Sequence, residues 1–470
     1  MSEATTDNIK ESFRDRLATV DAKGKRKWIF AQKPKGRFYN IRTWVSWGFF
    51  ILFFVLPFIK MNGRPLFLFN IPDAKFIIFG KIFWPQDFFI FGVSMLTFVV
   101  FVVLFTAAFG RLFCGWVCPQ TIFMEMLFRK VEYLIEGDAA QQKLLKKSEW
   151  TGKKIRIKLT KHLVFFLLAF IIANVFLAYI IGVDELKRII SEPVSEHIGG
   201  LASILVFSGV FYGVYAYFRE QVCTVVCPYG RLQSVLLDRN SMIVAYDYKR
   251  GEPRSKFKKV AELNTGDCID CFQCVKVCPT GIDIRNGTQM ECVGCTACID
   301  ACDKMMEATG RPKGLIRYAS ENGIADGKKL SYTGRMKFYT VVLILLGGLL
   351  TFLLVTRKNI DGTIVRAPGM LYQERGEDSL SNLYTIKVVN KTLLDIPVSL
   401  KIVNGPGRII EADGKAIQVK KEEQGKGSFF IVLPKSFIKS RKTPMEVGLY
   451  DGDKLITVLQ TNFMGPFTKF

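Results

Sequence analysis

The chain alternates between long apolar runs and charged segments, and this pattern predicts its architecture. Five runs contain almost no charge and are each roughly twenty residues long, the length that an α-helix needs to cross a bilayer. We expect these membrane spans at residues 44–60, 88–109, 163–183, 198–218 and 338–355. The predicted fold class is therefore a polytopic α-helical membrane protein with five spans.

A different periodicity follows the fifth span. Short segments in which apolar and polar residues alternate, the pattern of half-buried β-strands, begin at Leu383, Ile396, Ser428 and Leu455. Turn sequences separate them, and about a hundred residues of short strands suit an immunoglobulin-like β-sandwich. This predicted sandwich contains no cysteine, so no disulfide supports it. Similar alternation at residues 61–87 predicts a small hairpin in the membrane interface.

Basic residues are distributed unevenly between the loops. The net charge is +23, and residues 1–43 and 110–162 each contain eleven Lys or Arg, whereas the connectors on the opposite side contain few. The positive-inside rule accounts for this bias, so we expect no nucleic-acid partner. It also predicts a multi-pass protein of the bacterial inner membrane, with the N-terminus cytoplasmic and the C-terminal domain periplasmic. No signal-peptide pattern precedes the first span.

These boundaries predict five parts of the chain. They are a cytoplasmic N-terminal segment at 1–43, a four-span membrane core at 44–236, a cytoplasmic ferredoxin-like region at 237–337, a fifth span at 338–356 and a periplasmic immunoglobulin-like β-sandwich at 357–470. The ferredoxin-like region takes its name from eight cysteines within residues 264–306.

Those eight cysteines form two successive C-x2-C-x2-C-x3-C runs, the spacing of a bacterial ferredoxin with two [4Fe–4S] clusters. In that pattern three thiolates of one run hold a cluster, and the fourth crosses to the other. The expected ligand sets are Cys268, Cys271, Cys274 and Cys302 for one cluster, and Cys292, Cys295, Cys298 and Cys278 for the second. Eight cysteines would overfill a zinc site, and the cytoplasm is too reducing for disulfides. The runs therefore predict electron transfer.

The remaining four cysteines form an internal repeat. The motifs Cys114-x3-Cys118-Pro119 and Cys223-x3-Cys227-Pro228 each follow the inner end of an even-numbered span, and an arginine precedes each. We expect the four thiols to converge on one site. The plainer interpretation makes them small buried apolar side chains. Four thiolates otherwise suit a soft metal, so Cu(I), Zn(II) and a third [4Fe–4S] cluster stay open, with copper favoured because thiolates prefer Cu(I).

Other candidate groups carry less weight. His162 and His197 lie at opposite predicted membrane faces, so they cannot both ligate one haem. We expect His162 to be interfacial and His197 to be solvated. Met305 and Met306 follow the last cluster cysteine and are expected to pack around the cluster. No glycine-rich nucleotide motif opens a helix, so the electron donor is expected to bind transiently or to lie in the membrane.

Taken together, these features resemble the FixG/CcoG family, accessory proteins for the assembly of C-type haem-copper cytochrome c oxidases. The resemblance covers nearly the whole chain. It rests on both cysteine constellations, on Phe83-Trp-Pro-Gln-Asp87, and on a tail containing Asn462-Phe-Met-Gly-Pro466. In one departure, Asp303 follows Cys302 where many ferredoxins have proline, which leaves ligation intact.

The resemblance implies an oxidoreductase that reduces Cu(II) to Cu(I) in the cytoplasm, so that a copper chaperone or exporter can supply the oxidase subunits. It makes Cys114, Cys118, Cys223 and Cys227 candidate copper-reduction residues and copper ligands. Two other functions stay open: a quinol-linked membrane ferredoxin that passes electrons to a partner oxidoreductase, and a scaffold for oxidase assembly. The electron donor stays open between a quinol and a soluble reductant.

Overall fold

The computed structural model describes most of residues 18–466. The residues outside this description are 1–17, 21, 22, 24, 62, 72, 73, 257–264, 328–331, 370, 377, 393, 413–416, 422, 439 and 467–470. Parts of the predicted N-terminal segment, ferredoxin-like region and β-sandwich therefore lie outside the described residues. Two compact units divide the chain, one comprising Met1–Gly80 and Phe88–Leu350, the other Lys81–Asp87 and Thr351–Phe470.

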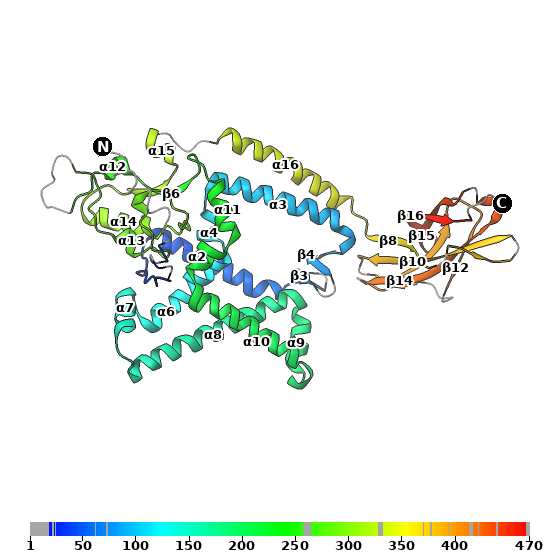
Figure 1. Cartoon of the computed structure of the whole chain (residues 1–470), viewed down its shortest axis with the longest axis horizontal. Coiled ribbons are helices and arrows are strands. Elements are labelled where there is room, and N and C mark those ends of the chain that lie inside the picture. The colour runs from blue at the N-terminus through cyan, green and yellow to red at the C-terminus, as the bar shows by residue number, and fades with distance from the viewer. Residues whose placement is uncertain are drawn as a thin grey trace. The chain divides into compact units, whose positions relative to one another are not determined.

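Five helices among the described residues are long and apolar enough to cross a membrane, which confirms the prediction of a multi-span protein (Figure 1). They are α2 (Arg37–Val55, extended by a 3₁₀ turn to Phe58), α3 (Phe88–Phe109), α8 (Gly152–Ile181), α10 (Ile198–Gly213, extended by the π-helix η5 at Val214–Phe218) and α16 (Gly334–Val355). Within the protein, α3 buries only Thr106 and Ala107. A helix that is apolar on all sides suits lipid surroundings.

Two of these helices begin earlier than their apolar runs predict. Helix α2 starts at Arg37 rather than Trp44, because the Asp300 carboxylate accepts hydrogen bonds from the first free backbone N–H groups of the helix. Helix α8 starts at Gly152 rather than Leu163, and its basic first turns face buried carboxylates as well as solvent. Hydrophobicity identifies only the membrane-embedded part of a helix. Contacts with buried polar partners allow the helix to continue beyond that part.

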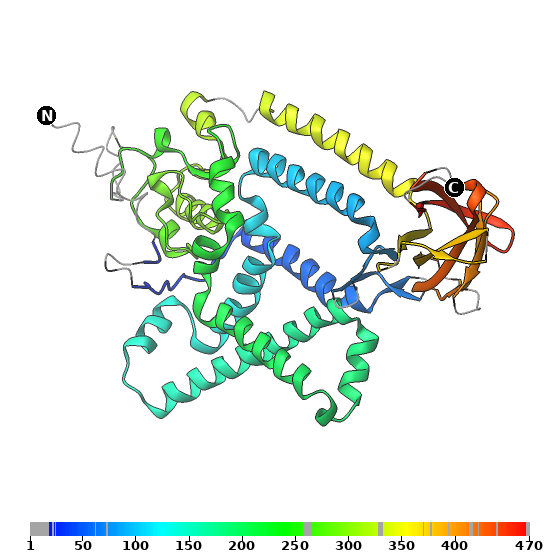
Figure 2. The same ribbon diagram turned by 45° about the vertical axis from the view of Figure 1, so that its right-hand side comes forward.

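Short helical segments follow α3 and α10 and carry the repeated cysteine motifs. They are α4 (Leu112–Trp116), α5 (Pro119–Ile122), the π-helix η3 (Phe123–Phe128), α6 (Arg129–Glu136) and α7 (Ala139–Lys147) after α3, and the π-helix η6 (Val222–Val226) and α11 (Pro228–Leu236) after η5. Helix α9 (Val183–Ser191) joins α8 to α10, which cross closely in both views (Figure 1 and Figure 2). Buried aromatic rings hold these elements together, and Phe128 stacks on Tyr215 with ring centroids 4.5 Å apart.

The ferredoxin-like region packs around a small antiparallel ribbon in the first unit. Its elements are β6 (Ile243–Tyr246), α12 (Tyr248–Gly251), α13 (Gln273–Lys276), η7 (Ile284–Asn286), α14 (Ala297–Ala308), β7 (Ile316–Ala319) and α15 (Glu321–Asp326). Strands β6 and β7 pair with Val244 opposite Tyr318. Its buried core is mainly aliphatic and includes Cys268 and Cys274, and four further cysteines pack against it.

The second unit is an immunoglobulin-like sandwich, as the strand pattern predicted. One sheet has the order β12-β14-β10-β8 with β9 beside β10, and the other has the order β13-β11-β15-β16. The strands are β8 (Ile360–Arg366), β9 (Gln373–Glu374), β10 (Ser379–Asn390), β11 (Ile396–Ile402), β12 (Arg408–Glu411), β13 (Ile417–Val419), β14 (Gln424–Pro434), β15 (Lys442–Asp451) and β16 (Lys454–Met464). Side chains from both sheets fill one apolar core, including Tyr384, Phe429 and Phe463.

The connector between the first two spans forms short strands, as its alternation predicted. They are β1 (Lys60–Met61), β2 (Arg64–Pro65), β3 (Phe67–Asn70), β4 (Lys75–Ile78) and β5 (Lys81–Phe83). Strands β3 and β4 form an antiparallel hairpin with Leu68 opposite Ile77, both buried. Strand β5 belongs to the second unit, together with the 3₁₀ turn η2 (Pro85–Asp87).

Candidate electron-transfer site

Two cavities inside the ferredoxin-like region gather the eight predicted cluster cysteines. The first cavity, of about 350 Å³, is lined by Cys268, Cys271, Cys274 and Cys302. The second cavity, also of about 350 Å³, is lined by Cys278, Cys292, Cys295 and Cys298, with Cys274 touching both. Each gathers three cysteines of one run and the fourth of the other, in keeping with crossed ligation. Soft donors and largely apolar walls make each cavity a fit for a [4Fe–4S] cluster.

The chain wraps around both cavities in the same way. Phe272 (φ 56°) and Thr296 (φ 63°) directly follow the second cysteine of each run and adopt the left-handed conformation. Helices α13 and α14 begin at the next residue in each case. The two loops differ in exposure, because Phe272 is 44% exposed and Thr296 only 1%. The first cavity therefore lies under a surface loop, whereas the loop of the second is covered.

Burial favours the protonated form of several cluster cysteines when no metal is bound. It raises the pKa of Cys274 and Cys302 to about 12, and that of Cys292 and Cys295 to about 11. A thiol must lose its proton to ligate iron, so cluster binding releases protons and stabilises the folded region.

The four cysteines of the repeat lie at the ends of short helical segments. Cys114 is in α4 and Cys223 is in the π-helix η6, while Cys118 and Cys227 each precede a helix that opens with proline. Proline suits this first position because it lacks the N–H that would be left unpaired there. π-Helices are rare and frequent at functional sites.

The structure brings the two motifs together. Burial raises the pKa of Cys114 to about 12, and the nearby Cys118 and Cys227 thiols add to this shift. Burial likewise raises the pKa of Cys223 to about 12, with contributions from Cys118, Cys114 and Cys227. The Cys114 thiol also donates a hydrogen bond of 3.1 Å to Gln233 Oε1 on α11. The four thiols of the repeat therefore share one partly buried environment, which we call the membrane-edge thiol site.

The spacing of these sulfurs limits which metals they fit as placed. Among the described residues, no three cysteines have sulfurs that all lie within 4.8 Å of one another, either at the membrane-edge thiol site or in the two cavities. A tetrahedral ion with bonds of about 2.3 Å would hold its sulfurs only about 3.8 Å apart. Among the described residues, neither the membrane-edge thiol site nor either cavity therefore holds three sulfurs at the spacing of one tetrahedral ion.

The backbone of the first repeat motif lies directly against the loop of the second cavity. A Cβ atom added to Gly115 would lie 2.5 Å from the Gly294 carbonyl oxygen, so only glycine allows this approach. Trp116 Nε1 donates a hydrogen bond of 3.1 Å to the Tyr318 hydroxyl. Buried Arg42 donates from Nε to the Gly115 carbonyl at 2.6 Å. The membrane-edge thiol site and the second cavity are therefore parts of one packed region.

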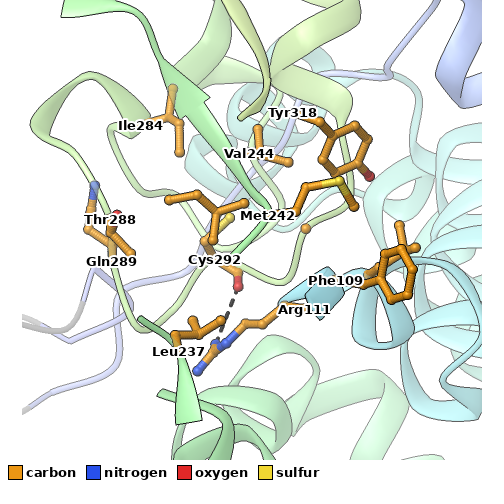
Figure 3. A pocket seen from close by; sticks show the side chains of 13 residues that line it. Phe109, Arg111, Leu237, Met242, Val244, Ile284, Thr288, Gln289, Cys292 and Tyr318 are labelled. Carbon is orange, nitrogen blue, oxygen red and sulfur yellow. Dashed lines mark hydrogen bonds between the residues drawn. The ribbon is translucent and has the colours of Figure 1, made fainter. Parts of the chain in front are cut away.

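Arg111 reinforces this junction from the side. Its guanidinium donates hydrogen bonds to the carbonyls of Gly230, at 2.5 Å, and of Cys292, at 3.3 Å, and also to that of Met290. Figure 3 shows the side chain reaching the Cys292 carbonyl beside a pocket of about 410 Å³. The arginine that precedes the first motif thus joins both motifs to the ferredoxin-like region.

The sequence did not predict a buried ion-pair network around Glu132. Glu132 on α6 contacts Lys161 Nζ at 2.6 Å and Arg219 at 2.7 Å, with all three side chains at most 5% exposed. Although burial opposes ionisation, the charges of Arg219 and Lys161 hold the pKa of Glu132 at about 2. Charged residues just past an apolar run look like an ordinary cationic loop, so the sequence contains no signal for their burial.

The structure also shows the surroundings of the remaining candidate residues. His162 on α8 shares a hydrogen bond of 2.8 Å with the Tyr212 hydroxyl, and partly exposed His197 contacts Glu192. Met305 and Met306 line the first cavity, and Met306 is 1% exposed. Among the described residues, the structure brings neither histidine to a cysteine site.

Three family models match the chain. A 4Fe-4S dicluster domain matches residues 218–321, and a second model, described as a 4Fe-4S binding domain, matches residues 91–159. The model of the IG-like fold at the C-terminal of FixG matches residues 350–466. The dicluster match supports two [4Fe–4S] clusters, and the third match agrees with the observed sandwich.

Relatives of known name extend over most of the chain. The nitrogen fixation protein FixG of Rhizobium meliloti is 31% identical over 87% of each chain. Protein RdxA of Cereibacter sphaeroides is 31% identical over 83% of this chain and 85% of its own. A crystal structure of a FixG-related protein from Vibrio parahaemolyticus aligns all of its length with 24% of this chain, at 20% identity and a TM-score of 0.20.

The identity and coverage of these relatives agree with the architecture. Candidate membrane spans, a dicluster region and an immunoglobulin-like C-terminal domain occur in one chain, in the order in which the family models match. The chain is a membrane-associated iron–sulfur electron-transfer protein and belongs to the FixG family.

Proposed function

We propose that this protein is a cupric reductase, which passes electrons from its [4Fe–4S] clusters to Cu(II) at the membrane-edge thiol site. The resulting Cu(I) would serve the assembly of a C-type haem-copper cytochrome c oxidase through a copper chaperone or exporter. The observation that carries this proposal is the contact of Gly115, beside Cys114, with Gly294 at the second cavity. That contact supports a short route between the cluster site and the thiols.

Each group of cysteines has a distinct role in this proposal. The residues lining the two cavities would hold the clusters, which supply one electron at a time when bound. Cys114, Cys118, Cys223 and Cys227 would bind Cu(II) as thiolates after losing their protons. Thiolates favour Cu(I), so one-electron reduction of the bound ion is favoured by its own ligands. Since no three of these sulfurs are close enough for one tetrahedral ion, copper would be bound by two at a time or after a local rearrangement.

The compartments follow from the distribution of charge. We place the N-terminus, the clusters and the membrane-edge thiol site on the cytoplasmic side of a bacterial inner membrane, and the β-sandwich in the periplasm. The support is the excess of Lys and Arg in residues 1–43 and 110–162. Cytoplasmic thiols stay reduced, which both the clusters and a copper-binding thiolate site require.

The test uses the purified full chain with its clusters reduced chemically. Wild type should convert Cu(II) to Cu(I), detected with a Cu(I)-specific chelator, while cluster absorbance bleaches and recovers. The double variant Cys114→Ser and Cys223→Ser should lose this activity and keep its cluster absorbance. Thr224→Ser is a matched control, because it changes a buried residue next to Cys223 but no thiol. Undiminished copper reduction in the double variant would exclude the membrane-edge thiols from the reaction.

A second function has specific support. The match described as a 4Fe-4S binding domain covers residues 91–159, where the only cysteines are Cys114 and Cys118. The sulfur spacing of the membrane-edge thiol site is also wider than a single tetrahedral ion requires. Both observations favour a third [4Fe–4S] cluster there, in a quinol-linked carrier that passes electrons to a partner oxidoreductase.

Iron and sulfide analysis separates the two functions. A third cluster predicts that the Cys114→Ser and Cys223→Ser variant loses a third of the iron of wild type, and that a quinol reduces the clusters. The cupric reductase predicts an unchanged iron content in that variant and binding of copper by the wild type. Clusters that no reductant of physiological potential can reduce would contradict both and favour a scaffold role.

A further inference from the structure

We propose that Arg111 is a positioning residue for electron transfer, joining the second cavity to the membrane-edge thiol site and raising the reduction potential of the cluster in that cavity. This inference needs electrons to pass between the two sites, as the proposed function does. It does not depend on whether copper or a third cluster occupies the thiols.

The geometry of Arg111 is that of a three-way bridge. Its side chain extends from the first repeat motif to the Gly230 carbonyl in the second motif and to the Cys292 carbonyl at the second cavity. Guanidinium has five donors in a fixed planar fork, so one side chain can hold several carbonyls at once. Removing it would free three chain segments whose mutual distances set the rate of electron transfer.

The charge of Arg111 is buried without a carboxylate. Its side chain is 9% exposed, and no ion pair joins it to Asp or Glu among the residues that the structure describes. Carbonyl dipoles solvate the guanidinium but leave its unit charge in place. A cluster gains negative charge on reduction, so a nearby cation that forms no ion pair favours its reduced form, and the Glu291 carboxylate, which also acts on Cys292, offsets part of this effect.

The same charge acts on both sites. Burial raises the pKa of Cys114 and of Cys292, and Arg111 partly offsets the shift of each thiol. This double influence agrees with a location between the membrane-edge thiol site and the second cavity.

Two other arginines show what distinguishes Arg111. Arg219 precedes the second repeat motif in the sequence, four residues before Cys223 where Arg111 is three before Cys114, but it pairs with Glu132 at 2.7 Å. Arg285 lines the first cavity, and Asp270 at 2.5 Å and Asp283 at 2.6 Å neutralise it. Of these three arginines, only Arg111 contacts a cluster cysteine and forms no ion pair among the described residues. The sequence repeat is therefore asymmetric in function.

Potentiometric titration of the full chain, followed by visible absorbance and electron paramagnetic resonance, tests the role of the charge. Arg111→Met should lower the midpoint potential of one cluster and leave the other unchanged. Arg111→Lys keeps the charge and should restore that potential. Arg285→Met is the matched control, because any shift it causes should fall on the other cluster. If Arg111→Met shifts neither cluster, or shifts both equally, the electrostatic role is wrong.

The rate of cluster reoxidation by Cu(II), or by a quinone if copper is inert, tests the bridge. Arg111→Met and Arg111→Lys should both slow cluster reoxidation by roughly tenfold or more. Neither side chain holds three carbonyls, and small displacements of the reacting groups lower the rate strongly. Gly115→Ala should slow it without shifting either potential, since it separates the surfaces and adds no charge. An unchanged rate in Arg111→Lys and Gly115→Ala would overturn the positioning role.

These variants also separate this inference from the proposed function. If wild type does not reduce copper, the cupric reductase is wrong, yet the potential shift in Arg111→Met still tests the role of Arg111. If Arg111→Met does not retain its clusters, Arg111→Lys and Gly115→Ala supply the decisive comparison. Cluster reoxidation rates in those two variants equal to that of wild type would contradict the inference.

Discussion

Buried charged residues in this protein are stabilised in two ways. Glu132 and Arg219 neutralise each other inside the membrane core, and Asp87 does the same with Arg357 and Lys391 in the second unit. Pairs of this kind are costly to break, because the remaining charge stays buried without a partner. Arg111 is held by carbonyls instead, so its charge remains available to act on its surroundings.

The Glu132 network predicts a specific response to acid. The folded-state pKa of Glu132, about 2, lies below its ordinary value of 4.5. Its contribution to stability is therefore complete above pH 4.5 and is lost as the pH falls towards 2. Thermal unfolding of the detergent-solubilised chain, followed by circular dichroism, should show a falling midpoint across this window. A midpoint that is independent of pH there would contradict the assignment.

Glu132→Gln should reduce that pH dependence and destabilise the protein strongly. Loss of the carboxylate leaves Lys161 and Arg219 buried without their partner, so we expect a destabilisation of about 3–5 kcal/mol. The unfolding midpoint of the variant at neutral pH measures this loss. Glu185→Gln is the control, because its partner Arg188 is 61% exposed and exposed pairs contribute little. Equal effects of the two substitutions would contradict the burial argument.

At the scale of elements, one carboxylate joins the ferredoxin-like region to the first span. Asp300 on α14 accepts hydrogen bonds from the backbone N–H groups of Phe38, at 3.0 Å, and Tyr39, at 2.8 Å. These groups have no partner within their own helix, so Asp300 caps α2 from another part of the chain. The contact fixes α14, which carries two cluster cysteines, against the start of α2.

Asp300→Ala should therefore weaken the contact between α14 and the start of α2. Removing an N-terminal cap costs about 0.5–2 kcal/mol, and we expect a loss in that range. Faster tryptic cleavage of the ferredoxin-like region, with the clusters still bound, would report it. Glu307→Ala on the same helix is the control, since Glu307 is 66% exposed and pairs with exposed Lys313. Identical cleavage rates in both variants would exclude a capping role.

A second element-scale prediction concerns Asp87, the last residue of Phe83-Trp-Pro-Gln-Asp87. Asp87 binds Arg357 at 2.5 Å and Lys391 at 2.8 Å, and Phe83 lies 4.5 Å from the Arg357 guanidinium. Although burial opposes ionisation, hydrogen bonds from both cations keep the pKa of Asp87 below its usual value. This motif therefore anchors the start of the sandwich.

Asp87→Asn should leave both cations without a counter-charge and destabilise the second unit by about 3–5 kcal/mol. Differential scanning calorimetry of the full chain should show one transition moving to lower temperature. Asp453→Asn, which changes a fully exposed partner of Lys401, is the control and should leave that transition in place. A transition that does not move in Asp87→Asn would contradict the anchoring role.

At the scale of the whole molecule, iron removal should unfold the ferredoxin-like region selectively. Six of its cysteines belong to or pack against a small aliphatic core, so metal ligation contributes much of its folding free energy. Treatment with an iron chelator should bleach the clusters and expose Lys276, Arg285 and Lys304 to trypsin, while α3, α8 and α10 persist by circular dichroism. Unchanged cleavage after bleaching would show that the region folds without iron.

Much of this architecture follows from the sequence, because its causes are local. The length of the apolar runs identifies all five spans, and cysteine spacing alone predicts which thiols share a cavity. The start of α8 and the role of Asp300 do not follow, since they depend on partners far along the chain. The contrast between Arg111 and Arg219 is likewise invisible in two matching motifs. Contacts with residues distant in the sequence determine these features, which local sequence patterns do not predict.

The contact between Gly115 and Gly294 has a consequence for how this family should be studied. Both residues lack a side chain, so truncation to alanine, the usual scan, adds an atom here instead of removing one. An alanine scan that measures the loss of side chains would therefore not test this contact. Truncation of neighbouring side chains would leave the backbone contact intact. Graded enlargement of Gly115, from alanine to valine, instead turns the junction into an adjustable spacer, and its length can be compared with the rate of electron transfer.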